Sequence, residues 1–192
     1  MKIMDWGDPV AAQEDWYNGI KFRSKLESKT AQALDNIGIP YQYEPDGYKL
    51  SNGMWYRPDF WLPGANQYIE CKGVMDAIDS AKIVGLVEDT NKSVLVVSYD
   101  NAMLVKRFFD NPNDPVVTYD SGILLCECTV CHGLYFLATE DIYTCTSCGA
   151  YDGDHYVMEV ADIESGQGLF AYGQKVASDK PIYKEIAERF NQ

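Results

Sequence analysis

The stretch that decides the fold runs from Met54 to Gly73 and reads MWYRPDFWLPGANQYIECKG. Two short runs of aromatic and apolar residues flank a Pro-Gly-Ala-Asn cluster at 63–66. This pattern predicts a β-hairpin whose two strands are joined by a short loop over those four residues. If Leu62 and Gln67 close the loop, the register of the whole hairpin is fixed, because each residue then has one partner on the opposite strand.

The expected register places Asp59 directly opposite Glu70. Because side chains alternate along a strand, Asp59, Glu70 and Lys72 are expected on one face of the hairpin. Tyr56 and Cys71 are expected on the other face, where a buried core thiol is a better interpretation of Cys71 than a nucleophile.

Two directly opposed carboxylates on a sheet repel each other. A divalent cation between Asp59 and Glu70 would reverse the sign of that interaction. Carboxylate oxygens, together with several retained waters, are the usual ligands of Mg²⁺ in sites that process phosphates. Lys72 lies one pleat beyond Glu70, where it can orient a water or balance charge on a phosphate. The hairpin therefore predicts a metal site.

A purely structural alternative uses the same residues. The diagonal pairs Arg57–Glu70 and Asp59–Lys72 would form a surface checkerboard of ion pairs, each contributing little to stability. The spacing alone does not separate this alternative from a metal site.

Composition and length favour an intracellular protein with one ordinary domain and a small appendage. Hydrophobic residues make up 46% of the 192 residues, enough to fill a core. The sequence contains no apolar run of membrane-spanning length, and its first residues lack the core of a signal peptide, so we expect a cytoplasmic location and no membrane partner.

The net charge of −13 argues against a broad nucleic-acid surface, because contact with phosphates normally needs a basic footprint. Residues 1–120 carry 12 Lys/Arg against 18 Asp/Glu, and residues 121–192 carry 4 against 11. Any DNA-binding surface must therefore be a local patch. The best candidate is a run of four basic residues: Lys21, Arg23, Lys25 and Lys29.

A helix is predicted over 24–38. Ser24 and Glu27 match a capping box, an apolar stripe follows, and Gly38 ends the helix. Glu27 has two interpretations, because it either reaches back to the start of the helix as a cap or faces the carboxylates of the hairpin.

The remaining elements complete a fold class. Residues 1–20 show no clear period and are expected to form an irregular arm or a short helix. Strands are expected at 41–44, 48–50 and 93–99, and helices at 77–89 and 101–109. Beyond the cysteine motifs, a strand at 156–163 and a helix at 181–190 are expected. This order predicts an α/β protein: an α/β/α sandwich with a mixed central sheet.

These motifs carry a resemblance. Glu27 on a helix, Arg-Pro-Asp ending at Asp59, and Glu-Cys-Lys at 70–72 resemble the PD-(D/E)xK nuclease superfamily. The segments 22–27, 38–40 and 43–45 add to the likeness. Together they resemble the small endonuclease-like branch encoded by phages and prophages, over about residues 22–99.

The resemblance implies roles for individual residues. Asp59 and Glu70 would ligate Mg²⁺ or Mn²⁺, and the carbonyl of Cys71 would add a ligand. Lys72 would position the attacking water or steady the phosphate in transition. Glu27 would bind the metal directly or through water, and the substrate would be DNA.

A second constellation lies further along the chain. Two Cys-x-x-Cys motifs are attached to aromatic, strand-like sequence, and they predict a tetrahedral Zn²⁺ site in a zinc ribbon whose ligands are Cys128, Cys131, Cys145 and Cys148. Four thiolates leave no open position, which indicates a structural rather than a catalytic ion. Cys126 is an alternative to Cys128, and a disulfide is the alternative to metal.

The domain expectation follows from these two constellations: a nuclease-like domain over 1–120, a zinc ribbon over 121–155, and a strand and helix over 156–192 that pack back on the body. The leading functional hypothesis is a metal-dependent endonuclease that hydrolyses DNA phosphodiester bonds. One rival is a catalytically silent acidic module that contacts a protein partner, in one version by imitating DNA. Another is a resolvase- or transposase-like cutting subunit that is active only inside a complex.

Overall fold

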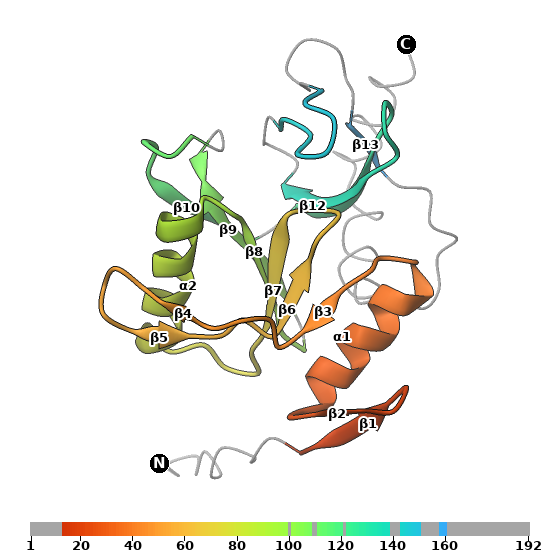
Figure 1. Ribbon diagram of the computed structural model, residues 1–192, viewed down its shortest axis with the longest axis vertical. Coiled ribbons are helices and arrows are strands. Elements are labelled where there is room, and N and C mark those ends of the chain that lie inside the picture. Colours follow the sequence, from red (N-terminus) through yellow and green to blue (C-terminus); the bar gives the residue numbers. More distant parts are fainter. Residues whose placement is uncertain are drawn as a thin grey trace, which may run out of the picture.

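The structure is a computed structural model that describes residues 13–99, 101–108, 111–120, 122–138, 143–150 and 158–160. Its centre is a six-stranded sheet with the order β10-β9-β8-β7-β6-β3 (Figure 1). The strands β7 and β8 pair in parallel and the other neighbours pair antiparallel, so the sheet is mixed as expected. The strands are β3 (Gln42–Tyr43), β6 (Phe60–Leu62), β7 (Gln67–Cys71), β8 (Val94–Val97), β9 (Ala102–Arg107) and β10 (Val116–Tyr119).

Two helices accompany this sheet, α1 (Lys25–Asn36) and α2 (Ala77–Thr90). The Ser24 side chain caps α1 by accepting the backbone N–H of Glu27, and Asp76 forms a capping box with Asp79 at the start of α2. Neither helix in the described part of the chain is long and apolar enough to cross a membrane.

Side chains that alternate along β7 pack into two different hydrophobic clusters. Ile69 belongs to a cluster with Leu34 of α1, whereas its neighbour Tyr68 belongs to a cluster with Leu86 of α2. All five residues of β7 are consequently buried, although the strand includes Glu70. A carboxylate inside such a strand needs compensating partners, because burying an uncompensated charge is strongly unfavourable.

The hairpin register agrees with the sequence expectation. Phe60 pairs with Ile69 and Leu62 with Gln67, so the loop spans 63–66 and Asp59 lies across from Glu70. The expectation for Tyr56 was wrong, because this residue packs in the α2 cluster with Tyr68. The reason is a break in the strand between Tyr56 and Phe60. Tyr56 belongs to a separate two-stranded sheet of β4 (Tyr48–Lys49) and β5 (Trp55–Tyr56).

Two other expectations were also wrong. Residues 102–107 form the strand β9 instead of a helix, because the run Ala-Met-Leu-Val lies between β8 and β10 and its apolar residues are covered on both faces. A continuous apolar run does not distinguish these two states. The first described residues form a hairpin of β1 (Asp15–Tyr17) and β2 (Ile20–Phe22). Its turn residues Asn18 and Gly19 have φ of 50° and 78°, which suits a tight hairpin turn.

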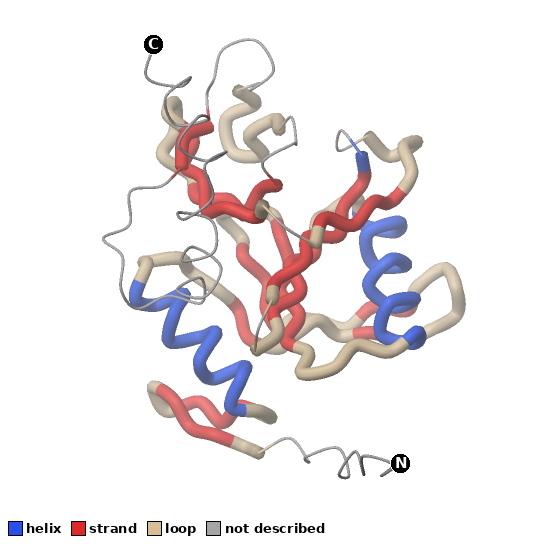
Figure 2. The backbone as a smooth tube through the Cα atoms, turned by 180° about the vertical axis from the view of Figure 1, so that it is seen from behind, coloured by secondary structure: helices blue, strands red, loops and turns tan. Residues whose placement is uncertain are grey.

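A three-stranded sheet with the order β12-β11-β13 follows the main sheet in the chain. It consists of β11 (Ile123–Cys128), β12 (Leu134–Ala138) and β13 (Met158–Val160). The strand β13 lies inside the expected strand at 156–163, and the expected helix at 181–190 lies outside the described residues. Figures 1 and 2 show this small sheet beside one end of the six-stranded sheet.

Gln67 joins the two sheets. Its amide Nε2 donates to the carbonyl of Phe136 at 2.9 Å, and its Oε1 accepts the N–H of Phe136 at 2.9 Å. The amide thus imitates a neighbouring strand while Nε2 also donates to the Ser93 hydroxyl at 2.8 Å. Because Gln67 is only 2% exposed, the polar atoms in this contact have little access to water as a substitute partner.

We predict that Gln67→Ala destabilises the protein by about 1–3 kcal/mol, because it removes two hydrogen bonds to the buried backbone of Phe136. Thermal unfolding followed by circular dichroism should show a lower midpoint. The exposed Gln42 on β3 supplies a matched control, and Gln42→Ala should change the midpoint little. Equal midpoints for the two variants would contradict this account of the contact.

Candidate functional site

The carboxylates of Asp59 and Glu70 each accept a backbone N–H from the opposite strand of the hairpin. The N–H of Cys71 donates to Oδ2 of Asp59 at 2.8 Å, and the N–H of Asp59 donates to Oε2 of Glu70 at 3.3 Å. At the end of the hairpin away from the loop, side-chain oxygens thus accept the hydrogen bonds that backbone carbonyls accept along the rest of the paired strands. Both acids are almost fully buried, with 4% and 3% of their surface exposed. The expected opposition of the two carboxylates is confirmed.

The second oxygen of each acid contacts a cation. Nη2 of Arg23 lies 2.7 Å from Oδ1 of Asp59, and Nζ of Lys72 lies 3.2 Å from Oε1 of Glu70. Lys72 also contacts Oδ1 of Asp79, at 3.1 Å. Ion pairs are therefore present, but they are not the diagonal pairs Arg57–Glu70 and Asp59–Lys72 considered from the sequence. They surround two buried acids and do not lie on an exposed face of the sheet.

Glu27 lies beside this pair, at the first turn of α1, and is 5% exposed. Its Oε1 accepts the Ser24 hydroxyl at 2.8 Å, and its Oε2 accepts the Tyr43 hydroxyl at 2.6 Å and the N–H of Arg23 at 3.1 Å. Its negative charge also raises the pKa of Asp59, after the larger effects of burial and of Glu70. Both interpretations of Glu27 therefore hold in part, since it supports the helix start and adds charge to the site.

Burial and crowding oppose full ionisation of the acids. Burial, followed by the charge of Glu70, raises the pKa of Asp59 to about 7. Burial likewise raises the pKa of Glu70, against the hydrogen bonds and the charge of Lys72 that favour its ionised form. Burial and the charge of Glu70 also raise the pKa of Tyr56, whose buried hydroxyl interacts with the Glu70 carboxylate. The local field thus disfavours further negative charge.

The acids in and around the site also outnumber the basic side chains that contact them. A network of ion pairs joins four carboxylates to three basic side chains, and Glu27, which accepts the N–H of Arg23, adds a fifth carboxylate, so acids outnumber bases by two. The excess of acids provides hard oxygen donors of the kind that divalent cations bind. The network comprises Glu27, Glu44, Asp59, Glu70, Asp79, Arg23, Arg57 and Lys72.

Cys71 behaves as the core thiol that the sequence predicts. Burial raises its pKa well above the usual range, and its sulfur contacts the Thr30 hydroxyl at 3.3 Å. A thiol with so little tendency to ionise is a poor nucleophile.

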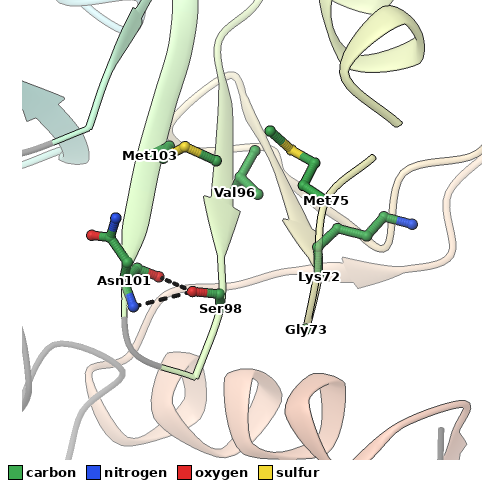
Figure 3. Close-up of a pocket in the computed structure, with 7 residues that line it drawn as sticks. All are labelled: Lys72, Gly73, Met75, Val96, Ser98, Asn101 and Met103. Atoms are coloured by element: carbon green, nitrogen blue, oxygen red, sulfur yellow. Dashed lines mark hydrogen bonds between the residues drawn. The ribbon is translucent and has the colours of Figure 1, made fainter. Parts of the chain in front are cut away.

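A pocket of about 160 Å³ lies next to the site (Figure 3). Lys72 borders it, but the Lys72 side chain extends away from Ser98 and Asn101 on the far wall (Figure 3). Typical ligand pockets measure roughly 300–1,000 Å³, so this space is too small for a nucleotide or a drug-sized cofactor.

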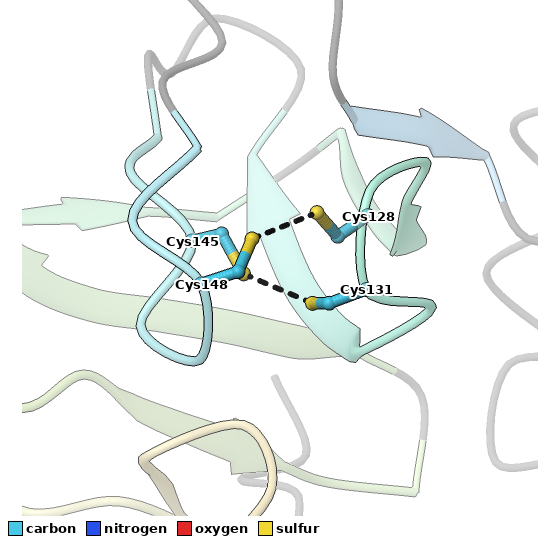
Figure 4. Close-up of side chains that lie close together, drawn as sticks. All are labelled: Cys128, Cys131, Cys145 and Cys148. Atoms are coloured by element: carbon cyan, nitrogen blue, oxygen red, sulfur yellow. Dashed lines mark hydrogen bonds between the residues drawn. The ribbon is translucent and has the colours of Figure 1, made fainter.

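The second site consists of four cysteines that two loops bring together (Figure 4). Their sulfur atoms lie within 4.8 Å of one another, and in the described part of the chain no other group of three or more potential ligands is so compact. Such a set is compatible with structural zinc. The members are Cys128, Cys131, Cys145 and Cys148.

The two Cys-x-x-Cys loops repeat one backbone geometry. The N–H of His132 donates to the carbonyl of Cys128 at 2.7 Å, and the N–H of Gly149 donates to that of Cys145 at 2.8 Å. His132 and Gly149 both have positive φ, of 59° and 75°. Two turns of the same geometry thus bring the four sulfur atoms together.

The structure separates the sequence alternatives for this site. The sulfur of Cys126 lies outside the cluster, in the core near the carbonyl of Leu124. All four cysteines are free, and the sulfur pairs Cys131–Cys145 at 3.5 Å and Cys128–Cys148 at 3.8 Å are well beyond a disulfide bond of about 2.05 Å.

Tyr135 supports one ligand. Burial acts to raise the pKa of Cys145, but hydrogen bonds from the Tyr135 hydroxyl and from the backbone N–H groups of Cys148 and Ser147 lower it to about 6. A sulfur prepared in this way is readily available as a thiolate, the form that binds metal.

Sequence reasoning missed Arg23 as a partner of Asp59 and Asp79 as a partner of Lys72. The Asp76-x-x-Asp79 pattern at the start of α2 was available as a capping signal, but it says nothing about Lys72. No local pattern connects Arg23 to Asp59, because 36 residues separate them.

The chain was compared with protein-family models, with curated proteins and with solved structures, and none of the three comparisons finds a match. What the two sites do is therefore inferred from their own geometry and charge.

We predict that the purified protein contains about one zinc per chain and that Cys148→Ser reduces this value to near zero. Because a small metal module folds on its ion, the variant should also unfold at lower temperature. Cys126→Ser, which alters a sulfur outside the cluster, should keep its zinc. Metal analysis by mass spectrometry measures both, and zinc lost from the Cys126 variant but retained in the Cys148 variant would reject the assignment.

A second prediction concerns pH. Because the folded pKa of Asp59 lies above its unfolded value, the folded state holds the proton more tightly, and stability should fall as pH rises from about 4 to about 7. Asp59→Asn should flatten this fall by roughly 1–3 kcal/mol in urea unfolding without added divalent ions. The exposed Asp46 provides the control variant Asp46→Asn. Identical pH profiles for wild type and Asp59→Asn would contradict the raised pKa.

Proposed function

We propose that the chain is a metal-dependent endonuclease of the PD-(D/E)xK type that hydrolyses DNA phosphodiester bonds. The observation that carries the proposal is the buried pair of Asp59 and Glu70, fixed by reciprocal backbone hydrogen bonds at the open end of a hairpin. Lys72 follows on the same strand path, and Glu27 approaches from a helix. This is the constellation that the sequence resemblance implies.

The proposed architecture is an α/β/α sandwich. Its support is the division of the core along β7, where Ile69 packs with the α1 cluster and Tyr68 with the α2 cluster. The two helices also lie on opposite sides of the sheet in both overall views (Figures 1 and 2). In this arrangement the acids sit where the central strands end, between the two layers of helix.

The oxygens Oδ1 of Asp59 and Oε1 of Glu70 are the proposed metal ligands, because the opposite oxygen of each acid is already held by a backbone N–H. The carbonyl of Cys71 is a further ligand in this proposal, and Glu27 acts through water. A bound Mg²⁺ or Mn²⁺ supplies charge neutralisation at the scissile phosphate and lowers the pKa of a coordinated water.

Lys72 is proposed to act as a fixed cation and not as a base. Burial lowers its pKa, but the charges of Glu70 and Asp79 outweigh burial and raise the pKa above the usual value. The ammonium therefore stays protonated at neutral pH. Asp79 anchors it from α2, so it can donate to a phosphate oxygen or orient the attacking water without leaving the site.

The four-cysteine module is proposed to be a zinc ribbon with a structural role. Four thiolates complete a tetrahedral site and leave no position for substrate. Through Gln67 and through Ser147, which donates to the carbonyl of Gly64 at 3.3 Å, the module holds the loop of the same hairpin that carries the acids.

A silent binding module is the second candidate. Arg23 and Lys72 already contact the two acids, and the net charge of −13 would suit a protein that imitates DNA or binds a basic partner. This candidate keeps the fold and the zinc module but has no hydrolytic activity.

Plasmid nicking with Mg²⁺ or Mn²⁺ separates the candidates. The wild type should nick DNA, and both Asp59→Asn and Lys72→Ala should reduce the rate by about 100-fold or more, because each removes electrostatic stabilisation of the transition state. Lys49→Ala, at an exposed position of β4, should retain the wild-type rate.

Two outcomes would contradict the proposal. A wild-type protein inactive on plasmid, linear, branched and single-stranded DNA would favour the silent module or a subunit active only in a complex. Activity that survives both substitutions would place the chemistry elsewhere.

A further inference from the structure

Two arginines share one carboxylate oxygen at the edge of the acid pair. Nε of Arg23 lies 2.8 Å from Oε1 of Glu44, and Nη2 of Arg57 lies 2.9 Å from the same oxygen. Their side chains are 55% and 48% exposed, whereas that of Glu44 is 24% exposed. Glu44 thus brings two half-exposed guanidinium groups together on a chain that is otherwise strongly acidic.

Glu44 is held in this place by its backbone. Its φ is 46°, an uncommon value for a residue with a side chain, and it precedes Pro45, which normally favours extended backbone in the preceding residue. Its N–H donates to the carbonyl of Asp59 at 2.7 Å. This main-chain hydrogen bond places Glu44, and with it the carboxylate that both guanidinium groups contact, next to Asp59.

Arg23 also makes a contact that conflicts with metal binding. Its Nη2 occupies Oδ1 of Asp59, and the other oxygen of this carboxylate already accepts the N–H of Cys71. A cation at Asp59 and the guanidinium of Arg23 consequently compete for the same oxygen. Arg57 makes its contact with Glu44 and is not part of that competition.

We propose that Arg23 and Arg57 form a binding site for a phosphate of the nucleic-acid backbone, and that a divalent ion on Asp59 releases Arg23 from the carboxylate into this site. Paired guanidinium groups present several N–H donors in a planar fork that matches phosphate oxygens. The inference rests on the proposed function, because it needs a metal at Asp59. It also names the local basic patch through which an acidic protein contacts DNA.

Metal affinity without DNA tests the competition. In a calorimetric titration of zinc-loaded protein with Mn²⁺, Arg23→Gln should bind the ion about tenfold more tightly than wild type, because a charge-assisted hydrogen bond no longer has to be broken. Arg57→Gln removes the same charge nearby without touching Asp59, and its affinity should rise by a clearly smaller factor. Equal affinities for the two variants would overturn the release of Arg23.

DNA binding at several salt concentrations tests the phosphate contact. With labelled duplex DNA and saturating Mn²⁺, each of Arg23→Gln and Arg57→Gln should lower the slope of log affinity against log salt by about one, as expected for one lost phosphate contact. Without Mn²⁺ only the Arg57 variant should lower it. Lys49→Gln, at an exposed position of β4 and outside this basic run, should leave the slope unchanged.

The outcomes distinguish this inference from the proposed function. Mn²⁺ binding and DNA cleavage with unaltered salt slopes would overturn the arginine pair alone. Absence of Mn²⁺ binding to wild type and variants would overturn both the metal-dependent nuclease and the release of Arg23. Absence of any DNA binding would overturn the phosphate site.

Discussion

The structure depends on one local exchange, in which carboxylates replace backbone carbonyls at the open end of a hairpin. Asp59 and Glu70 each accept an N–H from the opposite strand, so the strands stay paired although their ladder ends there. The exchange buries two acids, and burial raises the pKa of both because removing an ionised carboxylate from water costs free energy. Basic side chains offset part of this free-energy cost, and the proposed metal would offset the rest.

The hairpin is secured at both ends by different chemistry. At the acid end, α1 and α2 each contribute an acid from their first turn, since Glu27 lies beside the site at the start of α1 and Asp79 contacts Lys72 from the start of α2. At the loop end, Gln67 binds the backbone of the cysteine module as a strand would. A hairpin fixed at both ends is suited to a functional site, because the side chains of such a site must be positioned to within a fraction of an ångström.

Local patterns in the sequence predicted the parts of the site that lie close together in the chain. The loop at 63–66 determined the register and hence the opposition of Asp59 and Glu70, and the two Cys-x-x-Cys motifs predicted the cluster of four cysteines. The cationic partner Arg23 could not be predicted, because its contact depends on tertiary packing across 36 residues. The strand β9 was missed for a different reason, namely that a short apolar run buried on both faces has no diagnostic period. For the β1–β2 hairpin a signal was present, since Asn18-Gly19 is a favoured turn pair.

The central claim is that the carboxylate pair holds a divalent ion, and anomalous diffraction from crystals soaked in Mn²⁺ tests it most directly. The account predicts a manganese peak about 2.1 Å from Oδ1 of Asp59 and from Oε1 of Glu70, with the guanidinium of Arg23 displaced from Asp59. A fully soaked crystal with no peak there, and with Arg23 still bound to Oδ1, would contradict the account and leave a zinc-stabilised scaffold without a hydrolytic centre.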